Sequence, residues 1–507
     1  MSKNKLENIS TWFLVIIISG ILALFIINSI AFTGYNGLDN EEIILFKKDN
    51  ILFNIIGFIF ICIIYYLLYR LITLVAKSIK MVYIIGAFMI VSLLIGVYWV
   101  RHIYSMPVSD SLEVSNTAVN IRNGNYEDFG KGGYISVHPN QLGLLTLVRV
   151  VYKFCGINNW YAFQYLNVIA VPLIILSGTG IAYELMKDRR VVILTMLMLF
   201  MFSPLYFYTS YTYNDELSLC LMMLSVWFYC IFIRKERIHY AIVAGIFMAV
   251  ATTLRQNMLI PAIGTFIVIV ILSITRKKCN YFVSMVVMVF LCVIVSFANK
   301  NLYKKYYSSD TTKISSIAHI PMGQREGMLG PGWYNFYIDE LLNETDGDIK
   351  KQREKIALDI RQRSEYFLNN PKYMIEFYTA KINSQWNVPL YQGLAMNVQF
   401  EREREGFVKD VYADSIQRKC VEEYANIFHL IVMSMSLLYI IYLKKKREGL
   451  EKWLISVIFF GGFLFSIMWE AKSRYVFPYF VLLIPYAACG LNLMYLIIEK
   501  QLAKIKK

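Results

Sequence analysis

The sequence predicts an all-α polytopic membrane protein with about twelve transmembrane helices. Hydrophobic residues make up 57% of the 507 residues, and the mean hydropathy is +0.48, which a soluble protein would not reach. Apolar runs of about 17–25 residues recur, and that length crosses the hydrocarbon core of a bilayer. Because lipid offers the backbone no hydrogen-bond partner, each run is expected to be a helix. The expected spans are residues 11–32, 51–69, 81–100, 162–183, 191–207, 217–233, 239–254, 258–275, 281–298, 425–443, 453–469 and 475–497.

The distribution of charge predicts which side of the membrane each loop faces. If the N-terminus is cytoplasmic and the spans alternate, the inner segments contain 23 of the 51 Lys and Arg but 7 of the 36 Asp and Glu. The other segments are nearly neutral, so the net charge of +15 lies on one side. This bias is the positive-inside rule. It predicts a multi-pass cell-membrane protein with both termini in the cytoplasm and its large loops outside. Lipid headgroups explain the basic clusters, so the basic composition does not indicate a nucleic-acid partner.

The spacing of the spans divides the chain into four parts. Residues 1–80 are expected to form an accessory N-terminal hairpin, whose first span is too long for a signal-peptide core. Residues 81–298 are expected to form the transmembrane core, with a first outer loop at 101–160. Residues 299–424 form a larger, α-rich extracytoplasmic segment, and 425–507 contain the last helices and a basic tail.

One helix of the segment 299–424 can be placed from its sequence. Asp348 is suited to cap a helix start, and apolar side chains then recur at helical intervals. Asn370-Pro371 would end it, because the residue before proline avoids the helical conformation. A second helix is expected from Lys372 to Asn383.

The first candidate site residues lie in the loop after the third span. Asp110 stands in PVSDSLEV (107–114), and Glu113 follows three positions later. A carboxylate at the membrane surface can act as a general base toward an incoming hydroxyl group. A solvated loop acid or a helix cap is the alternative that the local residues favour.

A second pair of acids stands where an apolar span begins. Asp215 and Glu216 lie in YTYNDEL (211–217), and ionisable groups at such a depth are costly and often functional. They could bind the acceptor or hold a divalent cation, although one carboxylate pair is weak support for a metal. The alternative is that they only complement the helix dipole.

Three cations mark the outer boundary of other spans. Arg255 lies in TTLRQNM (252–258), and Lys472 and Arg474 follow Glu470 between the last two spans. Arginine suits phosphate because its fork makes two hydrogen bonds. Snorkelling explains one such arginine, but it explains three cations opposite Asp110 and Asp215 less well. Glu470 is expected to pair with one of the cations.

The remaining candidates are a histidine and two cysteines. His138 precedes Pro139 and could line the same cavity, or be an ordinary loop histidine. Of the eight cysteines, Cys155 and Cys420 are expected outside. The sequence allows a disulfide between them, but it favours two unpaired cysteines.

With these residues in order, the chain resembles the GT-C superfamily of polytopic glycosyltransferases. It is most similar to the dolichyl-phosphate-mannose protein mannosyltransferase and aminoarabinose transferase families, in a bacterial form. The resemblance covers residues 81–497. It is carried by Asp110 and by NIRNGNYEDFGKGGYISVHPNQLGLL (120–145), YTYNDELSL (211–219), ATTLRQNMLIP (251–261) and WEAKSRYVFPY (469–479).

The resemblance implies an inverting transfer of a sugar from a polyprenyl-phosphate donor to an extracytoplasmic glycan, lipid or protein. Asp110 matches the presumed base, and Asp215 matches a second-loop acid. Arg255 and Arg474 fall where basic residues meet the donor phosphate, with Lys472 beside them. Glu113 stands three residues from Asp110, whereas the mannosyltransferases have an immediate neighbour there.

Three other functions remain open from the sequence. A carrier or flippase of lipid-linked sugars would suit twelve spans, but carriers usually show repeats and midplane charges. An envelope polysaccharide polymerase or ligase would share the donor chemistry. A non-catalytic scaffold would not need one-sided carboxylates and arginines.

Overall fold

The computed structural model describes residues 3–37, 42–308, 311, 313–399 and 402–505. Within these ranges ten helices are long and apolar enough to cross a membrane. They are α1 (Lys3–Ala31, apolar from Thr11), α2 (Ile51–Val75), α3 (Met81–Ile103), α7 (Trp160–Met186), α10 (Asp215–Lys235), α12 (Leu259–Arg276), α13 (Cys279–Tyr303), α19 (Ile416–Lys446), α20 (Leu454–Met468, counted with the 3₁₀ turn Leu450–Trp453 before it) and α21 (Ser473–Ile505).

The other two expected spans are also helical, but each departs from a regular span. The run 191–207 is broken into α8 (Arg189–Phe200) and α9 (Pro204–Phe207), with a 46° bend between its two parts. The run 239–254 is the 17-residue helix α11 (Ile238–Leu254). All twelve runs are therefore helical, and the all-α polytopic fold is confirmed, but the count of twelve full-length spans is not met.

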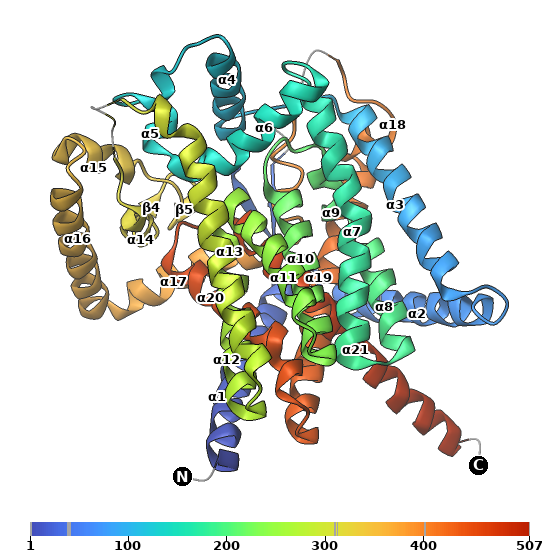
Figure 1. The fold of residues 1–507 in the computed structure, drawn as a ribbon. Helices are drawn as coiled ribbons and strands as arrows, with labels where there is room; N and C mark the ends of the chain where they lie inside the picture. Colours follow the sequence, from blue (N-terminus) through green and yellow to red (C-terminus); the bar gives the residue numbers. More distant parts are fainter. Residues whose placement is uncertain (1–2, 38–41, 309–310, 312, 400–401, 506–507) are drawn as a thin grey trace.

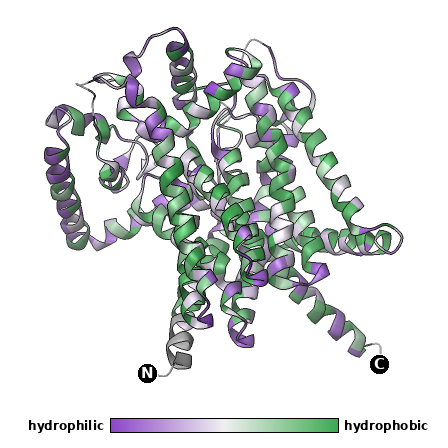
Figure 2. Cartoon of the chain, in the orientation of Figure 1, coloured by the Kyte–Doolittle hydropathy of each residue, from purple (hydrophilic) through white to green (hydrophobic). Residues whose placement is uncertain are grey.

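Both termini lie at one end of the helix bundle, and most of the connecting structure lies at the other (Figure 1). We call the second end the loop end. Its helices are α4 (Asp110–Arg122), α5 (Tyr134–Val137), α6 (Leu142–Cys155), α14 (His319–Met322), α15 (Tyr337–Thr345), α16 (Ile349–Asn369), α17 (Pro371–Trp386) and α18 (Gly406–Val411). Hydrophobic residues dominate the bundle, whereas α4 and α16 are largely hydrophilic (Figure 2).

Three two-stranded antiparallel sheets complete the described structure. They pair β1 (Phe32–Asn36) with β2 (Ile44–Lys48), β3 (Ser105–Met106) with β6 (Val398–Gln399), and β4 (Glu326–Gly327) with β5 (Gly330–Pro331). The β1–β2 hairpin joins α1 to α2 and binds the rest of the chain, because the Gly34 amide donates to the carbonyl of Asn387 at 2.8 Å. Together with the packing of α1 on α19, this contact joins the hairpin to the rest of the described structure.

The centre of the bundle is α21. Almost every side chain from Val476 to Asn492 is buried, and the helix packs against α19, α8 and α20. Gly490 permits the closest of these approaches, since a Cβ there would overlap the backbone of Met435. A helix buried on all sides gives its first turn a fixed position, and that turn carries Arg474.

The segment after α13 contains the helices that the sequence predicts. Asp348 caps α16 by accepting from the amides of Lys350 and Lys351, and α17 begins at Pro371. Lys381 of α17 is buried and donates to the carbonyls of Gly323, Ile467 and Trp469. Burial lowers the pKa of Lys381 to about 7, and the charge of Glu470 opposes that shift. These three bonds tie α17 and the loop before α15 to the connection between α20 and α21.

Candidate active site

Two arginines and one carboxylate from three helix ends meet at the loop end of the bundle. Asp215 begins α10, Arg255 follows α11, and Arg474 lies in the first turn of α21. One carboxylate oxygen of Asp215 pairs with Nη1 of Arg255, and the other lies 3.6 Å from Nη1 of Arg474. All three side chains are at most 8% exposed. One buried carboxylate therefore faces two buried cations, which leaves this group one positive charge in excess.

The helix ends explain how these three residues come together. Asp215 at the start of α10 is favoured by the helix dipole, whereas Arg474 at the start of α21 is disfavoured by it. The side-chain amide of Asn214 donates to the carbonyl of Leu254 and so joins the start of α10 to the end of α11. The backbone amide of Arg474 donates to Oε1 of Gln392 at 3.4 Å. The carboxylate of Asp215 offsets the unfavourable position of Arg474.

The arginines form part of the wall of a cavity of about 390 Å³. Residues from separate parts of the chain line it, among them His138, Gln141, Tyr213, Asn257, Trp469 and Glu470. Nη2 of Arg255 and Nε of Arg474 are buried and have no hydrogen-bond partner within the described ranges. Because unpaired buried donors are costly, these two groups are suited to hold an anion.

Tyrosine side chains surround Arg474. The guanidinium carbon lies 5.0 Å from the ring centre of Tyr213 and 5.5 Å from that of Tyr475. Its Nη1 donates to the hydroxyl of Tyr211 at 3.1 Å. Aromatic faces attract a cation, so these rings stabilise and orient a guanidinium group that is buried among apolar helices.

Asp110 lies at the start of α4 and is not among the residues that line the cavity of the arginines. The preceding residue, Ser109, has a φ of 46°, which is an uncommon backbone conformation for a residue other than glycine. Asp110 is half-buried and accepts a hydrogen bond of 3.0 Å from the hydroxyl of Tyr134. Glu113, one turn further along α4, is exposed. Asp110 is thus partly shielded and held by Tyr134, whereas Glu113 lies at the surface.

Tyr213 is within electrostatic reach of both Asp110 and the arginines. Burial raises the pKa of Tyr213 to about 12; the charge of Asp110 acts in the same direction, and those of Arg474 and Arg255 act against it. Its hydroxyl accepts a hydrogen bond of 2.6 Å from Nε2 of Gln141. The acid of the first loop and the two arginines therefore act electrostatically on one phenol group in the cavity wall.

His138 lines the same cavity, as the sequence suggested it could. The close contact of α6 with α11 brings this loop to Arg255, because Gly143 lies directly against the backbone of Thr253 and Leu254. The ring of His138 lies 4.9 Å from that of Tyr134. Burial lowers the pKa of His138 below its ordinary value, and Asp110 opposes the shift, so the imidazole is neutral at pH 7.

Two expectations about the loop before α21 need correction. Lys472 does not line the cavity of the arginines; its ammonium pairs with Glu42 at 3.0 Å. Burial alone would raise the pKa of Glu42, but Lys472 and Arg474 lower it below its ordinary value. Glu470 does line the cavity, yet within the described residues it pairs with no cation and accepts a hydrogen bond of 3.1 Å from Tyr475.

The second acid of α10 has a different environment from the first. Glu216 is 1% exposed, and neither of its carboxylate oxygens has a hydrogen-bond partner among the described residues. Among all the residues that the structure describes, no group of three or more His, Cys, Asp or Glu side chains is arranged to hold a metal ion. The pairing partners of Asp215 are the two arginines.

Several residues of the site were not predicted. Tyr213 and Tyr475 lie inside motifs that were chosen for their charges, and Tyr134 lies in the first outer loop. The sequence does not point to Glu42, because this residue lies within the predicted accessory hairpin of residues 1–80. The sequence marks Glu42 only by a short polar stretch, Asn40-Glu41-Glu42, in the loop that follows the first apolar span. No sequence pattern points to Gln392, whose side chain accepts a hydrogen bond from the backbone amide of Arg474.

A search of curated proteins finds no match to this chain. Among solved structures, the chain is similar to the archaeal oligosaccharyltransferase AglB from Archaeoglobus fulgidus, in complex with an inhibitory peptide and a dolichol-phosphate, at 11% identity and a TM-score of 0.42. That match covers 83% of this chain and 51% of AglB, so the chain spans about half the length of that protein.

The chain is also similar to ArnT from Cupriavidus metallidurans bound to undecaprenyl phosphate, at 11% identity and a TM-score of 0.32. That match covers 81% of this chain and 78% of ArnT. A family model described as "conserved hypothetical integral membrane protein" matches residues 2–345. These residues are most of the sequence, and they include α1 to α15 with Asp110, Asp215 and Arg255. The chain therefore belongs to this family of integral membrane proteins.

Proposed function

We propose that the protein is a membrane glycosyltransferase of the GT-C type. It transfers a sugar from a polyprenyl-phosphate donor to an extracytoplasmic acceptor, with inversion at the anomeric carbon. The observation that carries this proposal is that Arg255 and Arg474, which share the single carboxylate of Asp215, line a cavity and have positive charge in excess. The buried N–H groups of the two arginines, which lack partners among the described residues, are suited to a donor phosphate.

The leaving group is the first part of the mechanism. As the bond between the anomeric carbon and the phosphate oxygen breaks, its electron pair moves to the phosphate. Arg255 and Arg474 stabilise that developing negative charge, and because they are buried and held in place, little reorganisation is needed. Asp215 keeps the two cations together when no phosphate is bound.

The second part is activation of the acceptor. Asp110 takes the proton of the acceptor hydroxyl group as the oxygen attacks the anomeric carbon from the side opposite the phosphate. The hydrogen bond from Tyr134 fixes the orientation of this carboxylate. His138, neutral at pH 7, lines the cavity of the arginines and can hydrogen-bond sugar hydroxyl groups.

A transfer assay tests this function. The lipid-linked sugar that accumulates in cells lacking the protein is isolated, radiolabelled and incubated with the purified protein and a membrane extract as the acceptor source. We expect label to leave the lipid and polyprenyl phosphate to be released. Movement of the intact lipid across a vesicle membrane without cleavage would instead identify a carrier.

We further propose that the loop end faces away from the cytoplasm, and three exposed cysteines allow a direct test. Cys155 and Cys420 are free thiols at the loop end, and Cys279 is a free thiol at the opposite end of α13. In single-cysteine variants on intact cells, a membrane-impermeant maleimide is expected to label Cys155 and Cys420 but not Cys279. Labelling of Cys279 alone would place the cavity on the cytoplasmic side.

A further inference from the structure

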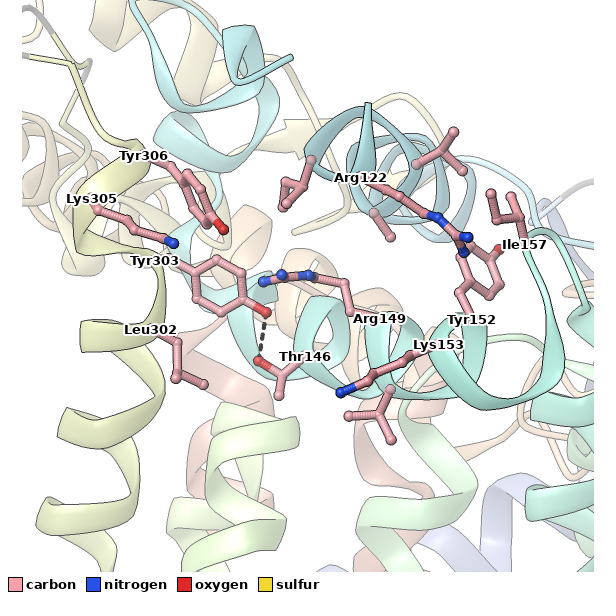
Figure 3. Close-up of a pocket in the computed structure, with 14 residues that line it drawn as sticks. Arg122, Thr146, Arg149, Tyr152, Lys153, Ile157, Leu302, Tyr303, Lys305 and Tyr306 are labelled. Carbon is pink, nitrogen blue, oxygen red and sulfur yellow. Dashed lines mark hydrogen bonds between the residues drawn. The ribbon is translucent and has the colours of Figure 1, made fainter. Parts of the chain in front are cut away.

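A second pocket at the loop end has a composition unlike that of the first. It lies between α4, α6 and the end of α13, has a volume of about 620 Å³, and is separate from the cavity that holds Arg255 and Arg474. Arg122, Arg149, Lys153 and Lys305 contribute to its lining, which contains no carboxylate among the described residues (Figure 3). The loop segments are nearly neutral as a whole, so four cations in one pocket are a local concentration of positive charge.

Regular structure places these cations together. Arg149 and Lys153 are four residues apart on α6 and therefore lie on one face of that helix. Arg122 ends α4, which packs on α6, and Lys305 belongs to the 3₁₀ turn Lys304–Tyr306 that follows α13. The pocket thus joins three elements that are distant in the sequence.

The centre of the pocket is Arg149, whose side chain is half-buried. Its guanidinium carbon lies 5.3 Å from the ring centre of Tyr303 and 6.0 Å from that of Tyr306. The hydroxyl groups of Tyr303 and Thr146 lie 2.8 Å apart, so the ring is held in place. Lys305 lies over the ring of Tyr306 at 4.9 Å. Aromatic rings therefore hold the cations of Arg149 and Lys305. The described lining contains no carboxylate that would compete with a bound anion for these cations.

The apolar side of the pocket continues toward a lipid-facing surface. Val150, Ile157 and Leu302 line it and are exposed. Leu302 continues the exposed apolar side chains of α13, such as Val293 and Phe297. An anion that carries a hydrocarbon chain would therefore contact cations at its head and apolar side chains along its tail.

We propose that this pocket binds a phosphate group, and that a phosphate-bearing membrane lipid is its ligand. Arginine forks pair with phosphate oxygens through two hydrogen bonds, and lysines add compact charges. The site is independent of the proposed transfer reaction, because none of its lining residues lines the first cavity.

Binding to the full-length protein in detergent tests the site. Native mass spectrometry measures binding of phosphatidylglycerol and of phosphatidylcholine, and equilibrium dialysis measures radiolabelled inorganic phosphate. We expect phosphatidylglycerol to bind, and the double variant Arg149→Gln/Lys305→Gln to bind it at least about tenfold more weakly, since two charge-assisted contacts are lost. Lys304→Gln is the matched control, because Lys304 is exposed beside Lys305 and does not line the pocket.

The possible results separate the sources of the phosphate. If inorganic phosphate binds and shows the same dependence on Arg149 and Lys305, the site takes phosphate in soluble form as well. If the double variant and Lys304→Gln bind phosphatidylglycerol as the unaltered protein does, the site does not exist. Lys305→Gln alone keeps the test valid if Arg149→Gln fails to fold. Arg255→Gln is expected to leave this binding unchanged, so failure of the proposed transfer function would not be mistaken for failure of this site.

Discussion

Asp110→Asn is expected to reduce the turnover of sugar transfer by about 10²–10⁴-fold, the usual contribution of a general base. An amide has nearly the shape of the carboxylate and can still accept the hydrogen bond from Tyr134, but it cannot take a proton. Because the side chain is half-buried and its partner is retained, the apparent melting temperature should change little. Turnover and melting temperature are measured on the same purified protein.

Glu113→Gln is the control for this variant. Glu113 lies on the same helix one turn away, and it is exposed. Its replacement removes the same charge from the same helix without removing the half-buried carboxylate that Tyr134 holds. A loss of activity as large in Glu113→Gln as in Asp110→Asn would show that α4 acts through its overall charge, and it would remove Asp110 from the catalytic role.

The helices could be predicted because the signal for a membrane span is local. A run of apolar residues must form its hydrogen bonds within itself in lipid, so no knowledge of distant residues is needed. The run 191–207 shows the limit of this reasoning. Its hydropathy predicts one span, but Ser203-Pro204 interrupts it, and proline removes a helical hydrogen bond. The two halves meet at an angle of 46°.

The candidate site could be predicted only in part, because its pairs join distant segments. Asp215, Arg255 and Arg474 are recognisable one by one as charges at the ends of apolar spans, and the predicted topology places all three ends on one side of the membrane. Which cation pairs with which acid does not follow. Lys472 is two residues from Glu470, the nearest candidate acid, yet its partner is Glu42, 430 positions away.

The second pocket shows the same limit more clearly. Arg122, Arg149 and Lys305 each look like an ordinary solvated cation of a loop or helix end, and nothing in the sequence links them. Packing of α4 on α6, and of α6 on α13, creates the cluster. Such sites can be found only from a three-dimensional arrangement, since the charges are modest in any single segment.

Asp215→Asn is expected to destabilise the protein strongly when no ligand is bound. The variant leaves Arg255 and Arg474 buried side by side without their shared carboxylate. Removing one partner of a buried ion pair costs about 3–5 kcal/mol, and here two cations lose it. The apparent melting temperature in detergent should fall clearly below that of the unaltered protein. Glu216→Gln is the matched control, because Glu216 is the next residue, is equally buried and has no ion pair in the described structure.

The response to ligand distinguishes a phosphate site from a structural ion cluster. If the two arginines bind the donor phosphate, polyprenyl phosphate supplies the negative charge that Asp215→Asn has removed. A ligand that binds only the folded protein raises its stability with concentration, so polyprenyl phosphate should raise the melting temperature of Asp215→Asn more than that of the unaltered protein. Uncharged polyprenol should have no such effect, since it brings the same chain without the anion. Equal shifts with polyprenyl phosphate and polyprenol would mean that the arginines serve only to hold the helix ends together.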